Sequence, residues 1–497
     1  MRGGQKYMIQ FKAMEDESFK YTKEVAIPVK HIFKDMLKYA PSKLFGLLGN
    51  ALIVPVYTNL LSPSQYGVYA ISLAVLSFLC IIFSDWIGMS GLRFFRQNQL
   101  SEKIPNYIST LVFVLVTNLL SMYGLCFVFR DKFYEYFSIS PKIFLFILVL
   151  IIPVAIRALL FQVLRAQIKP GAFTVSTIIN QILTIILAVG IIKFYNFGAV
   201  SILIAMAVSI SFIDILLIAQ TKILKYLKPE KPNKDMLKSV YWYGVPIAAA
   251  SLSIWVINQS NKFITTHYHG LEDAGFVGVA YNLTFPILMT LFSIITIAAF
   301  PRIINLYEDN IDVRPIISKL TGYFVLISLP IVVLISLYSK DITVVFANSQ
   351  YVDAYILLPY FAFSAFFLSF TDFTTYQYHL ANKTIVLTLL KVISAVLGLA
   401  LNILLIKNMG LLGAGIALLV SNLFYFVLTL IVKMPNLEWR VPYKEFLHLF
   451  LCFVPTIFLW VLLEKSTILP LLQINILLIT YYSFYYSTRR YFKDFGV

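Results

Sequence analysis

The chain has 497 residues, of which 59% are hydrophobic and only 13% charged, and its formal net charge is +16. Soluble domains carry about 25% charged residues, so this composition excludes an ordinary water-soluble enzyme or binding module and indicates a protein of the lipid bilayer. The three cysteines (Cys80, Cys126 and Cys452) lie in apolar runs without metal-ligand or disulfide-framework spacing. The sequence therefore predicts no metal site and no other cofactor.

The first segment, residues 1–41, is polar and of mixed charge. It lacks the apolar core of about 7–15 residues that a signal peptide needs, so we expect the first apolar run to direct membrane insertion. Two interpretations of this cytoplasmic segment stay open. It is either a disordered tail or a surface helix whose lysines bind anionic lipid.

Long apolar runs follow one another along the rest of the chain. A membrane-spanning helix needs about 20 apolar residues, whereas a barrel strand needs only about 9–11. The run lengths predict an all-α polytopic membrane protein with about 14 transmembrane helices joined by short loops. The predicted limits are 42–61, 66–88, 106–129, 142–164, 172–192, 198–221, 239–261, 276–300, 316–338, 355–378, 384–406, 411–432, 446–463 and 470–487.

The basic residues are distributed unevenly between the loops. With the N-terminus inside, 29 of the 40 lysines and arginines fall in inside segments and eight in outside segments, where Lys262 is counted. Cytoplasmic loops of membrane proteins are enriched in these residues. The pattern predicts that both termini are cytoplasmic, in the bacterial cytoplasmic (inner) membrane. It also accounts for the positive charge without nucleic-acid binding.

Two stretches of sequence occur twice. LSPSQYGVYAISL around Gly67 is echoed by GLEDAGFVGVAYNL around Gly275, and KFYNFGAVS (193–201) by KNMGLLGAG (407–415). The offsets, about 208 and 214 residues, predict two parallel six-helix repeats. Parallel repeats are a transporter architecture with the substrate at their interface. The predicted organisation is an N-terminal segment (1–41), an N-lobe (42–221), a basic cytoplasmic linker (222–238), a C-lobe (239–432), and two extra helices with a cytoplasmic C-terminus (433–497).

The repeated turns and the step Phe300-Pro301-Arg302 resemble the polysaccharide flippases, the Wzx-type O-antigen and capsule exporters of the multidrug/oligosaccharidyl-lipid/polysaccharide superfamily. The resemblance covers roughly residues 40–430. It implies a V-shaped bundle of two lobes that moves an undecaprenyl-pyrophosphate-linked oligosaccharide from the inner to the outer leaflet by alternating access. It further implies a monomer among membrane lipids, coupling to a proton or sodium gradient, and a polysaccharide polymerase and chain-length regulator as partners.

The passage NQSNKFI (258–264) departs from that family. Family members often carry an aspartate-arginine pair late in the seventh span, and only the cation, Lys262, is kept here. Any role of the family's carboxylate is therefore not carried over to this chain.

Charged side chains inside the predicted spans gather in their cytoplasmic halves. Such groups cost roughly 2.5–3.5 kcal/mol each on insertion scales, so they usually face a cavity or a partner. Arginine and lysine bind phosphate oxygens. The candidates for binding the substrate pyrophosphate are Arg157, Lys391, Lys43 and Arg93. The candidates for cavity polar groups or ion coupling are Asp372, Asp85, Asp214, Asn50, Asn258 and Lys262.

Structural roles compete with these assignments. Lys43, Asp85 and Arg93 lie near the interface and could simply extend toward the headgroups. Asp372 falls almost on Arg157 under the repeat offset. The two could be a structural pair or could alternate as partners in two states.

Three functions stay open at this point. The first is the lipid-linked oligosaccharide flippase, with the lipid II flippase as a close relative. The second is a cation-coupled drug or metabolite antiporter of the same superfamily, which would use the acidic residues. The third, a membrane enzyme, is disfavoured because the loops are short and carry no paired-carboxylate or metal-binding motif.

Overall fold

The computed structural model describes residues 43–49, 51–137, 139–167, 169–227, 233–435, 437, 443–464 and 470–493. These residues form helices and connecting turns and contain no strand. Four sequence predictions lie wholly or partly outside the described residues: the N-terminal segment 1–41, the polar role of Asn50, the middle of the basic linker (228–232) and the end of the cytoplasmic C-terminus (494–497).

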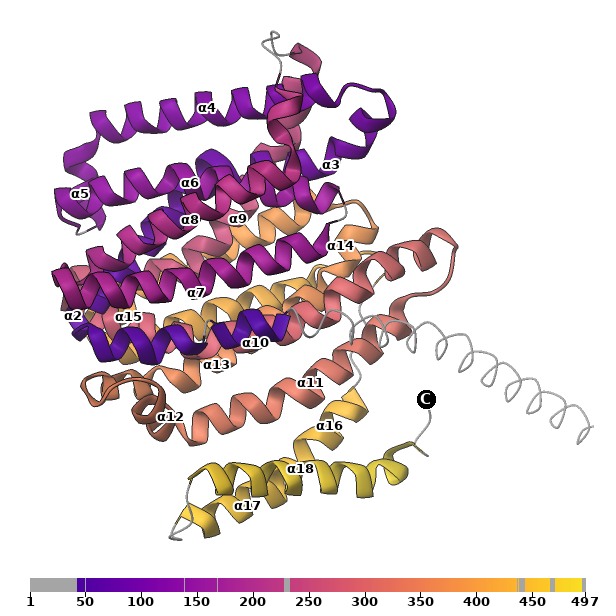
Figure 1. Cartoon of the computed structure of the whole chain (residues 1–497). Coiled ribbons are helices and arrows are strands. Elements are labelled where there is room, and N and C mark those ends of the chain that lie inside the picture. The colour runs from indigo at the N-terminus through magenta and orange to yellow at the C-terminus, as the bar shows by residue number, and fades with distance from the viewer. Residues whose placement is uncertain are drawn as a thin grey trace, which may run out of the picture.

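The first half of the chain is a series of long helices (Figure 1). Residues 43–49 and 51–60 are helical. The following elements are α2 (Pro63–Cys80), the π-helix η1 (Ile81–Asp85), α3 (Trp86–Leu100), α4 (Ile104–Val128), α5 (Arg130–Phe137), α6 (Pro141–Ala166), α7 (Pro170–Tyr195), α8 (Ala199–Thr221) and η2 (Ile223–Tyr226).

The second half contains longer helices, followed by the last three helices of the chain. These elements are α9 (Lys234–His269), α10 (Leu271–Glu308), α11 (Arg314–Leu337), α12 (Ser339–Phe346), η3 (Ser349–Ile356), α13 (Leu358–Thr374), α14 (Tyr376–Leu380), α15 (Thr384–Ile431), α16 (Tyr443–Leu451), α17 (Phe453–Glu464) and α18 (Pro470–Lys493). In Figure 1 the last three lie together beside α11, at the edge of the bundle.

Ten helices of the described residues are long and apolar enough to cross a membrane, or eleven if Ser349–Ile356 and Leu358–Leu380, bent by 56°, form one span. The chain is therefore a multi-pass membrane protein, although the predicted number of 14 spans is not confirmed. Several predicted limits differ for local reasons. The helix α15 contains two predicted spans, and α18 is not among the ten because its second half is rich in tyrosine and charge.

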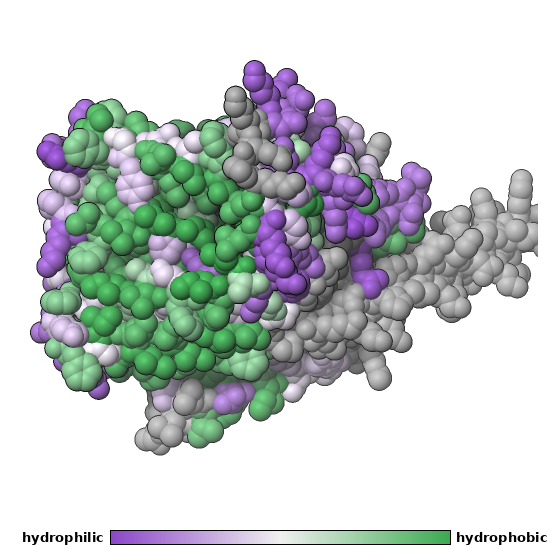
Figure 2. Space-filling model, turned by 45° about the horizontal axis from the view of Figure 1, so that its top comes forward, coloured by the Kyte–Doolittle hydropathy of each residue, from purple (hydrophilic) through white to green (hydrophobic). Residues whose placement is uncertain are grey.

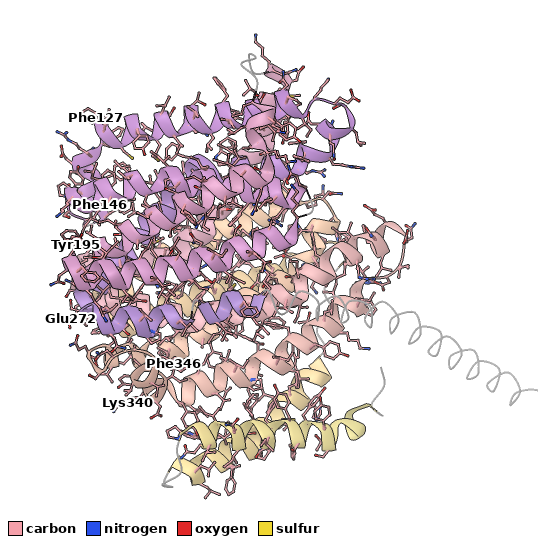
Figure 3. The ribbon with its side chains drawn as sticks, viewed as in Figure 1. Phe127, Phe146, Tyr195, Glu272, Lys340 and Phe346 are labelled. Atoms are coloured by element: carbon pink, nitrogen blue, oxygen red, sulfur yellow. The ribbon has the colours of Figure 1, made fainter. Side chains whose placement is uncertain are left out.

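The surface has the polarity of a bilayer protein. Figure 2 shows an apolar band across the bundle with polar residues toward both ends. Large apolar side chains such as Phe127, Leu145 and Ile186 are exposed. Water would oppose this exposure, whereas lipid chains are a matching solvent. Phe127, Tyr195 and Glu272 lie at the same end of the bundle (Figure 3). The sequence predicted that the chain faces outside near each of these three residues.

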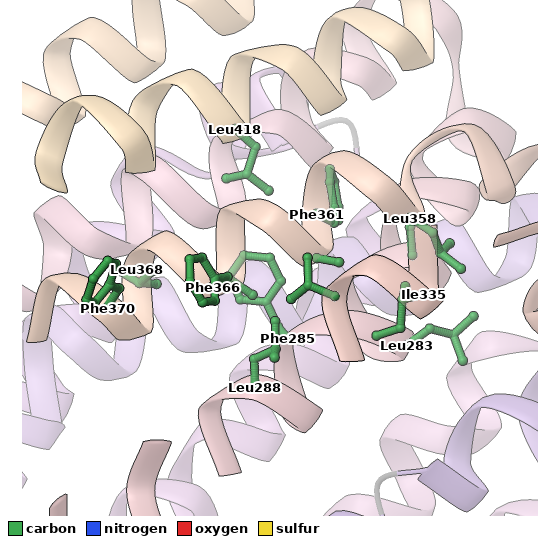
Figure 4. Close-up of a cluster of buried hydrophobic side chains, with 14 of the residues drawn as sticks. Leu283, Phe285, Leu288, Ile335, Leu358, Phe361, Phe366, Leu368, Phe370 and Leu418 are labelled. Atoms are coloured by element: carbon green, nitrogen blue, oxygen red, sulfur yellow. The ribbon is translucent and has the colours of Figure 1, made fainter. Parts of the chain in front are cut away.

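The core of the second half is built from aromatic and aliphatic side chains of α10, α11, α13 and α15. Phe285, Phe361, Ile335 and Leu418 are buried in one cluster (Figure 4). Further neighbouring pairs are α9 with α15, α2 with α10, and α8 with both α6 and α7. The chain therefore brings α2, from its first quarter, against α10.

The helices α2 and α10 cross at two glycines. A Cβ atom on Gly67 would strike the carbonyl oxygen of Leu271 and lie 3.1 Å from the backbone nitrogen of Gly275. A Cβ on Gly275 would strike the carbonyl oxygen of Pro63 and lie 3.2 Å from the nitrogen of Gly67. Only glycine permits such a close approach of two backbones. Gly67 and Gly275 are the residues that the sequence repeat aligns, and their mutual contact favours that interpretation.

Two turns between helices use a glycine in the same backbone conformation. Gly198, between α7 and α8, has φ 57° and ψ −135°, and Gly410, inside α15, has φ 57° and ψ −131°. Gly410 thereby breaks α15 into two helices at the boundary between predicted spans 384–406 and 411–432. The two turns lie in the stretches KFYNFGAVS and KNMGLLGAG, so they also favour the predicted repeat.

Replacing Gly410 with alanine should destabilise the protein by about 1–3 kcal/mol, because an L-residue is strained at this positive φ. Crowding would not be the cause, since the nearest atom to an added Cβ is Cε1 of His269 at 3.7 Å. The measurement is thermal unfolding of the purified protein in detergent. Gly322→Ala in α11, where a Cβ meets nothing within 4 Å, is the matched control and should be neutral or stabilising. Equal melting temperatures for the two variants would contradict the prediction.

Candidate functional site

The helix α9 carries a polar surface deep in the bundle. It runs from Lys234 to His269 and ends only at Gly270, which has φ 93°. The predicted span ended at residue 261, so the assignment of Lys262 to an outside loop was wrong. The threonines that follow do not stop the helix, because the hydroxyl of Thr266 donates to the carbonyl of Lys262 at 2.8 Å. Lys262 is only 6% exposed.

Lys262 is held by a neutral amide and an aromatic ring. Its Nζ donates to Oε1 of Gln259 at 2.6 Å, one helical turn earlier, and lies 4.7 Å from the ring centre of Tyr281 on α10. Within the part of the chain that the structure describes, the recorded ion pairs do not include Lys262. A buried cation without a carboxylate partner is costly, so it usually marks a functional site.

Asparagine side chains link α9 to α13 and α15 beside this lysine. Nδ2 of Asn422 donates to Oδ1 of Asn258 at 3.2 Å and to Oγ of Ser364 at 2.7 Å. Nδ2 of Asn402 donates to Oγ of Ser260 at 3.0 Å. Asn258, a predicted cavity residue, is therefore hydrogen-bonded between helices. This network fixes the position of the α9 segment that carries Lys262.

Two side chains on the same segment have unused hydrogen-bonding atoms. Asn261 is fully buried, and neither its amide nitrogen nor its amide oxygen has a hydrogen-bond partner. The same is true of the hydroxyl of Thr265, one turn further on. Buried polar groups are normally hydrogen-bonded, so these atoms can accept or donate bonds to a bound polar molecule or water.

Arg157 on α6 and Asp214 on α8 are electrostatic neighbours, and no direct ion pair between them is recorded among the described residues. The two side chains interact electrostatically, and Arg157 also interacts with Cys80 at the end of α2. Asp214 is 5% exposed, and neither carboxylate oxygen accepts a hydrogen bond. The sequence pattern offered no partner for Asp214, because α6 and α8 are separated by another helix along the chain.

A second pair joins Asp372 on α13 to Lys391 on α15. These two side chains also interact electrostatically, and Lys391 acts on His379 of α14 as well. In this conformation the electrostatic neighbours are Asp214 for Arg157 and Lys391 for Asp372, and an alternation of Arg157 and Asp372 between two states stays a prediction. The repeat offset makes the two residues equivalent in position, and equivalent positions in two copies need not touch.

The remaining charged candidates lie on other helices of the first half of the chain. Lys43 is half-buried close to the Arg165 guanidinium, and Arg93 is exposed on α3. Asp85 ends the π-helix η1, where the hydroxyl of Ser84 donates to its carboxylate at 3.4 Å. The four cations predicted to bind pyrophosphate come from the 43–49 helix, α3, α6 and α15. The structure records no contact that joins them, and their role stays a prediction.

Direct hydrogen bonds join helices of the two predicted lobes. Toward one end, Nδ2 of Asn282 donates to the hydroxyl of Tyr66 at 2.9 Å, and the hydroxyl of Tyr351 donates to the carbonyl of Leu61 at 2.9 Å. Toward the other, the hydroxyl of Ser90 donates to the carbonyl of Val240 at 3.1 Å. Helices from both predicted lobes are thus tied together at two levels.

Comparison with known proteins identifies the family. A family model described as "Polysaccharide biosynthesis protein" matches residues 56–356. The chain belongs to this family. This confirms the resemblance to polysaccharide flippases that the repeated turns suggested. No curated protein matches the chain.

Solved structures share the fold of this polysaccharide biosynthesis protein at low sequence identity. "Lipid II flippase MurJ, inward closed conformation" has a TM-score of 0.71 at 14% identity, covering 91% of this chain and 98% of that one. An inward-facing multidrug resistance MATE family transporter of the MOP superfamily has a TM-score of 0.60 at 14% identity, covering 78% and 93%. An outward-facing MATE transporter has a TM-score of 0.52 at 15% identity, covering 82% and 97%. The fold is therefore one that membrane transporters use.

Part of the site could not be found from the sequence of this family member. Gln259 precedes Lys262 by three residues, a spacing that places both on one helical face, so this partner was detectable. Tyr281 lies on the next helix, and no sequence spacing predicts that its ring covers the ammonium group. The unpartnered atoms of Asn261 and Thr265 likewise depend on tertiary packing.

Proposed function

We propose that the protein is a flippase that moves an undecaprenyl-pyrophosphate-linked oligosaccharide, the repeat unit of an O-antigen, capsule or exopolysaccharide, from the inner to the outer leaflet by alternating access. The family membership and the transporter fold support this proposal. The observation that carries it is the buried cation of Lys262, which has a neutral amide and a ring as its recorded partners.

The chemistry of the substrate fits this site. A pyrophosphate group crossing the membrane must be met by cations, because an unpaired charge in a medium of low dielectric constant is very costly. Lys262 supplies a point charge. The unpartnered amide of Asn261 and hydroxyl of Thr265, on the same helix, supply hydrogen bonds of the kind that sugar hydroxyls and phosphate oxygens need.

We assign the parts of the molecule accordingly. The protein lies in the bacterial cytoplasmic membrane with both termini inside, as a monomer that receives its lipid-linked glycan from the inner leaflet. Two six-helix lobes (42–221 and 239–432) rock about the crossing of α2 and α10, and the remaining two helices are an appendix. A polysaccharide polymerase and a chain-length regulator act on the product.

Two alternatives have observations in their favour. The cation-coupled antiporter is favoured by the fold shared with MATE transporters and by the buried acids Asp214 and Asp372, which could bind a cation. The lipid II flippase is favoured by the fold shared with MurJ. Both differ from our proposal in the molecule carried, so a test must follow the transported lipid.

Deleting the gene should abolish the surface glycan and cause lipid-linked glycan to accumulate in the inner leaflet. Expression of the intact protein should restore the glycan. Arg157→Ala and Lys391→Ala should each restore less than about a tenth of it, because a hydrogen bond to a charged group is worth about 1.5–3 kcal/mol and about 1.4 kcal/mol is a factor of ten. Surface glycan and the lipid-linked pool are measured in parallel, with membrane expression checked for each variant.

Lys193→Ala is the matched control, since Lys193 is exposed at the far end of α7. It should restore the glycan fully. Intact surface glycan in the deletion strain together with a new sensitivity to cationic drugs would favour the antiporter. Loss of peptidoglycan precursor transport would favour the lipid II flippase.

A further inference from the structure

One helical span of the first half contacts the second half of the chain at two places, and a π-helix lies between them. The span runs from Pro63 to Leu100 and consists of α2, η1 (Ile81–Asp85) and α3. Its first part, α2, crosses α10 at Gly67 and Gly275. Its last part, α3, packs against α9. The two contacts are therefore separated by a short irregular segment of the same span.

The contact between α3 and α9 is made by close packing and a hydrogen bond. A Cβ atom on Gly244 of α9 would strike Cε3 of the Trp86 indole, so this ring occupies the place of a side chain on α9. The hydroxyl of Ser90 donates to the carbonyl of Val240 at 3.1 Å. Neither contact involves a charge or a covalent bond. Both can therefore break and form again during transport.

The π-helix is the place where this span can bend. A π-helix closes its turns with i→i+5 instead of i→i+4 hydrogen bonds, is rare, and is frequent at functional sites. Sharp bends of helices occur at such segments and where a side chain enters the backbone ladder. The carbonyl of Ile82 accepts from Nε1 of Trp86 at 2.9 Å. The carbonyl of Phe83 accepts from Nδ2 of Asn118 on α4 at 3.4 Å. Side chains thus hold part of the η1 backbone.

Both of these side chains also contact Tyr241 on α9. The hydroxyl of Tyr241 donates to Oδ1 of Asn118 at 3.2 Å. The rings of Tyr241 and Trp86 have their centres 5.1 Å apart. A movement of α9 away from α3 would remove Tyr241 from Asn118 and Trp86 together. The two side chains that bind η1 would then lose their common neighbour on α9.

We propose that η1 is a hinge, and that Tyr241 holds this hinge through Asn118 and Trp86 as long as α3 and α9 are in contact. Release of Tyr241 lets α3 bend away from α9 at η1, while the crossing of α2 and α10 stays intact. The bundle then opens at the end predicted to be cytoplasmic. This movement adds a bend within one span to the rocking of the two lobes. It does not depend on the molecule that is carried, so it goes beyond the proposed function.

The opening can be measured with a cysteine at position 240. Val240 is fully buried, and Val240→Cys keeps the backbone carbonyl that Ser90 binds. In a protein whose native cysteines (Cys80, Cys126 and Cys452) are replaced with alanine, a water-soluble maleimide reacts with position 240 only when α3 and α9 separate. The purified full-length protein is labelled in detergent. Hydrogen exchange of the η1 amides, followed by mass spectrometry, reports on the hinge in the same protein.

Tyr241→Phe removes the hydroxyl that Asn118 binds and keeps the ring. It should raise the rate of maleimide reaction about two- to tenfold, because the loss of one hydrogen bond shifts an equilibrium by about that factor. It should also raise hydrogen exchange in η1. Tyr123→Phe on α4 is the matched control, since the hydroxyl of Tyr123 donates at 2.6 Å to the carbonyl of Leu148 in the same half of the chain. This control should change neither rate.

Deletion of Ile81 tests the hinge directly. It removes one of the five residues of η1, so that an uninterrupted α-helix with i→i+4 bonds can join α2 to α3. The maleimide reaction of Val240→Cys should then fall below that of the parent protein. An unchanged or faster reaction in a folded deletion variant would overturn the proposal. If this variant does not fold, hydrogen exchange in Tyr241→Phe decides.

Three results with Tyr241→Phe would also contradict the hinge. An unchanged maleimide reaction would mean that Tyr241 does not hold α3 and α9 together. A faster reaction without a change of exchange in η1 would mean that the lobes move as rigid bodies. An equal rise in Tyr123→Phe would mean that α4 has loosened as a whole. In each case the proposed function would stand, because it is tested by the transported lipid.

Discussion

Replacing Lys262 with methionine should abolish transport and, at the same time, raise the melting temperature of the protein. Lys262 is buried in α9, and its recorded partners are the amide of Gln259 and the ring of Tyr281. Removing a charge from a span gains about 2.5–3.5 kcal/mol on insertion scales. The lost ring contact is worth about 0.5–2 kcal/mol. The difference between the two ranges is a net stabilisation of about 0.5–3 kcal/mol.

The combination of the two results separates function from structure. If Lys262 held the fold together, its removal would lower the melting temperature, whereas a group kept for an anionic substrate is dispensable for stability. Transport is measured by restoration of surface glycan in the deletion strain, and stability by thermal unfolding in detergent. Lys193→Met, at an exposed position, should change neither.

Two other outcomes would change the interpretation. Full transport by Lys262→Met would remove Lys262 from the substrate path and leave Arg157 and Lys391 as the remaining internal cations. A lower melting temperature would assign Lys262 a structural role. Lys262→Arg, which keeps the charge, should retain part of the transport.

The long helices were predictable because the bilayer imposes run length directly on the sequence. The ends of these helices were harder to predict, and α9 shows the reason. The segment FITTHYH (263–269) mixes apolar and polar residues, but a threonine hydroxyl bonded to the preceding turn, like that of Thr266, is compatible with a helix in a low-dielectric environment. Gly270 was the available signal for the end, since glycine is the usual residue after a helix C-terminus.

Individual charges of the candidate site were also predictable, but their partners were not. Arg157 and Lys391 stood out because each interrupts an apolar run, whereas Asp372 lies at a polar span end. The repeat offset aligned Arg157 with Asp372, whereas the structure sets Arg157 against Asp214 and Asp372 against Lys391. A repeat predicts which positions correspond. Which positions touch depends on how helices distant in sequence pack.

The crossing of α2 and α10 gives the largest effect we expect on stability. Gly67→Ala should destabilise the protein by about 1–3 kcal/mol or more, because overpacking of a tight contact costs that amount. The added carbon would meet the carbonyl oxygen of Leu271, and backbone atoms cannot rotate away as a side chain would. In an uncrowded helix the same change is favourable by about 1 kcal/mol. Gly190→Ala in α7, where nothing lies within 4 Å of an added Cβ, should therefore stabilise the protein instead of destabilising it.

The double variant Gly67→Ala/Gly275→Ala tests whether the two glycines form one contact. Each added Cβ would approach the backbone nitrogen of the other glycine, at 3.1 and 3.2 Å, so either substitution alone already forces the two helices apart. Once they have separated, the second carbon meets less resistance. The double variant should thus cost clearly less than the sum of the single variants, as coupled neighbours do and independent sites more than about 7–10 Å apart do not. Thermal unfolding of the four proteins in detergent completes the cycle, and additive losses would mean that the glycines act separately and that the repeated turns do not meet face to face.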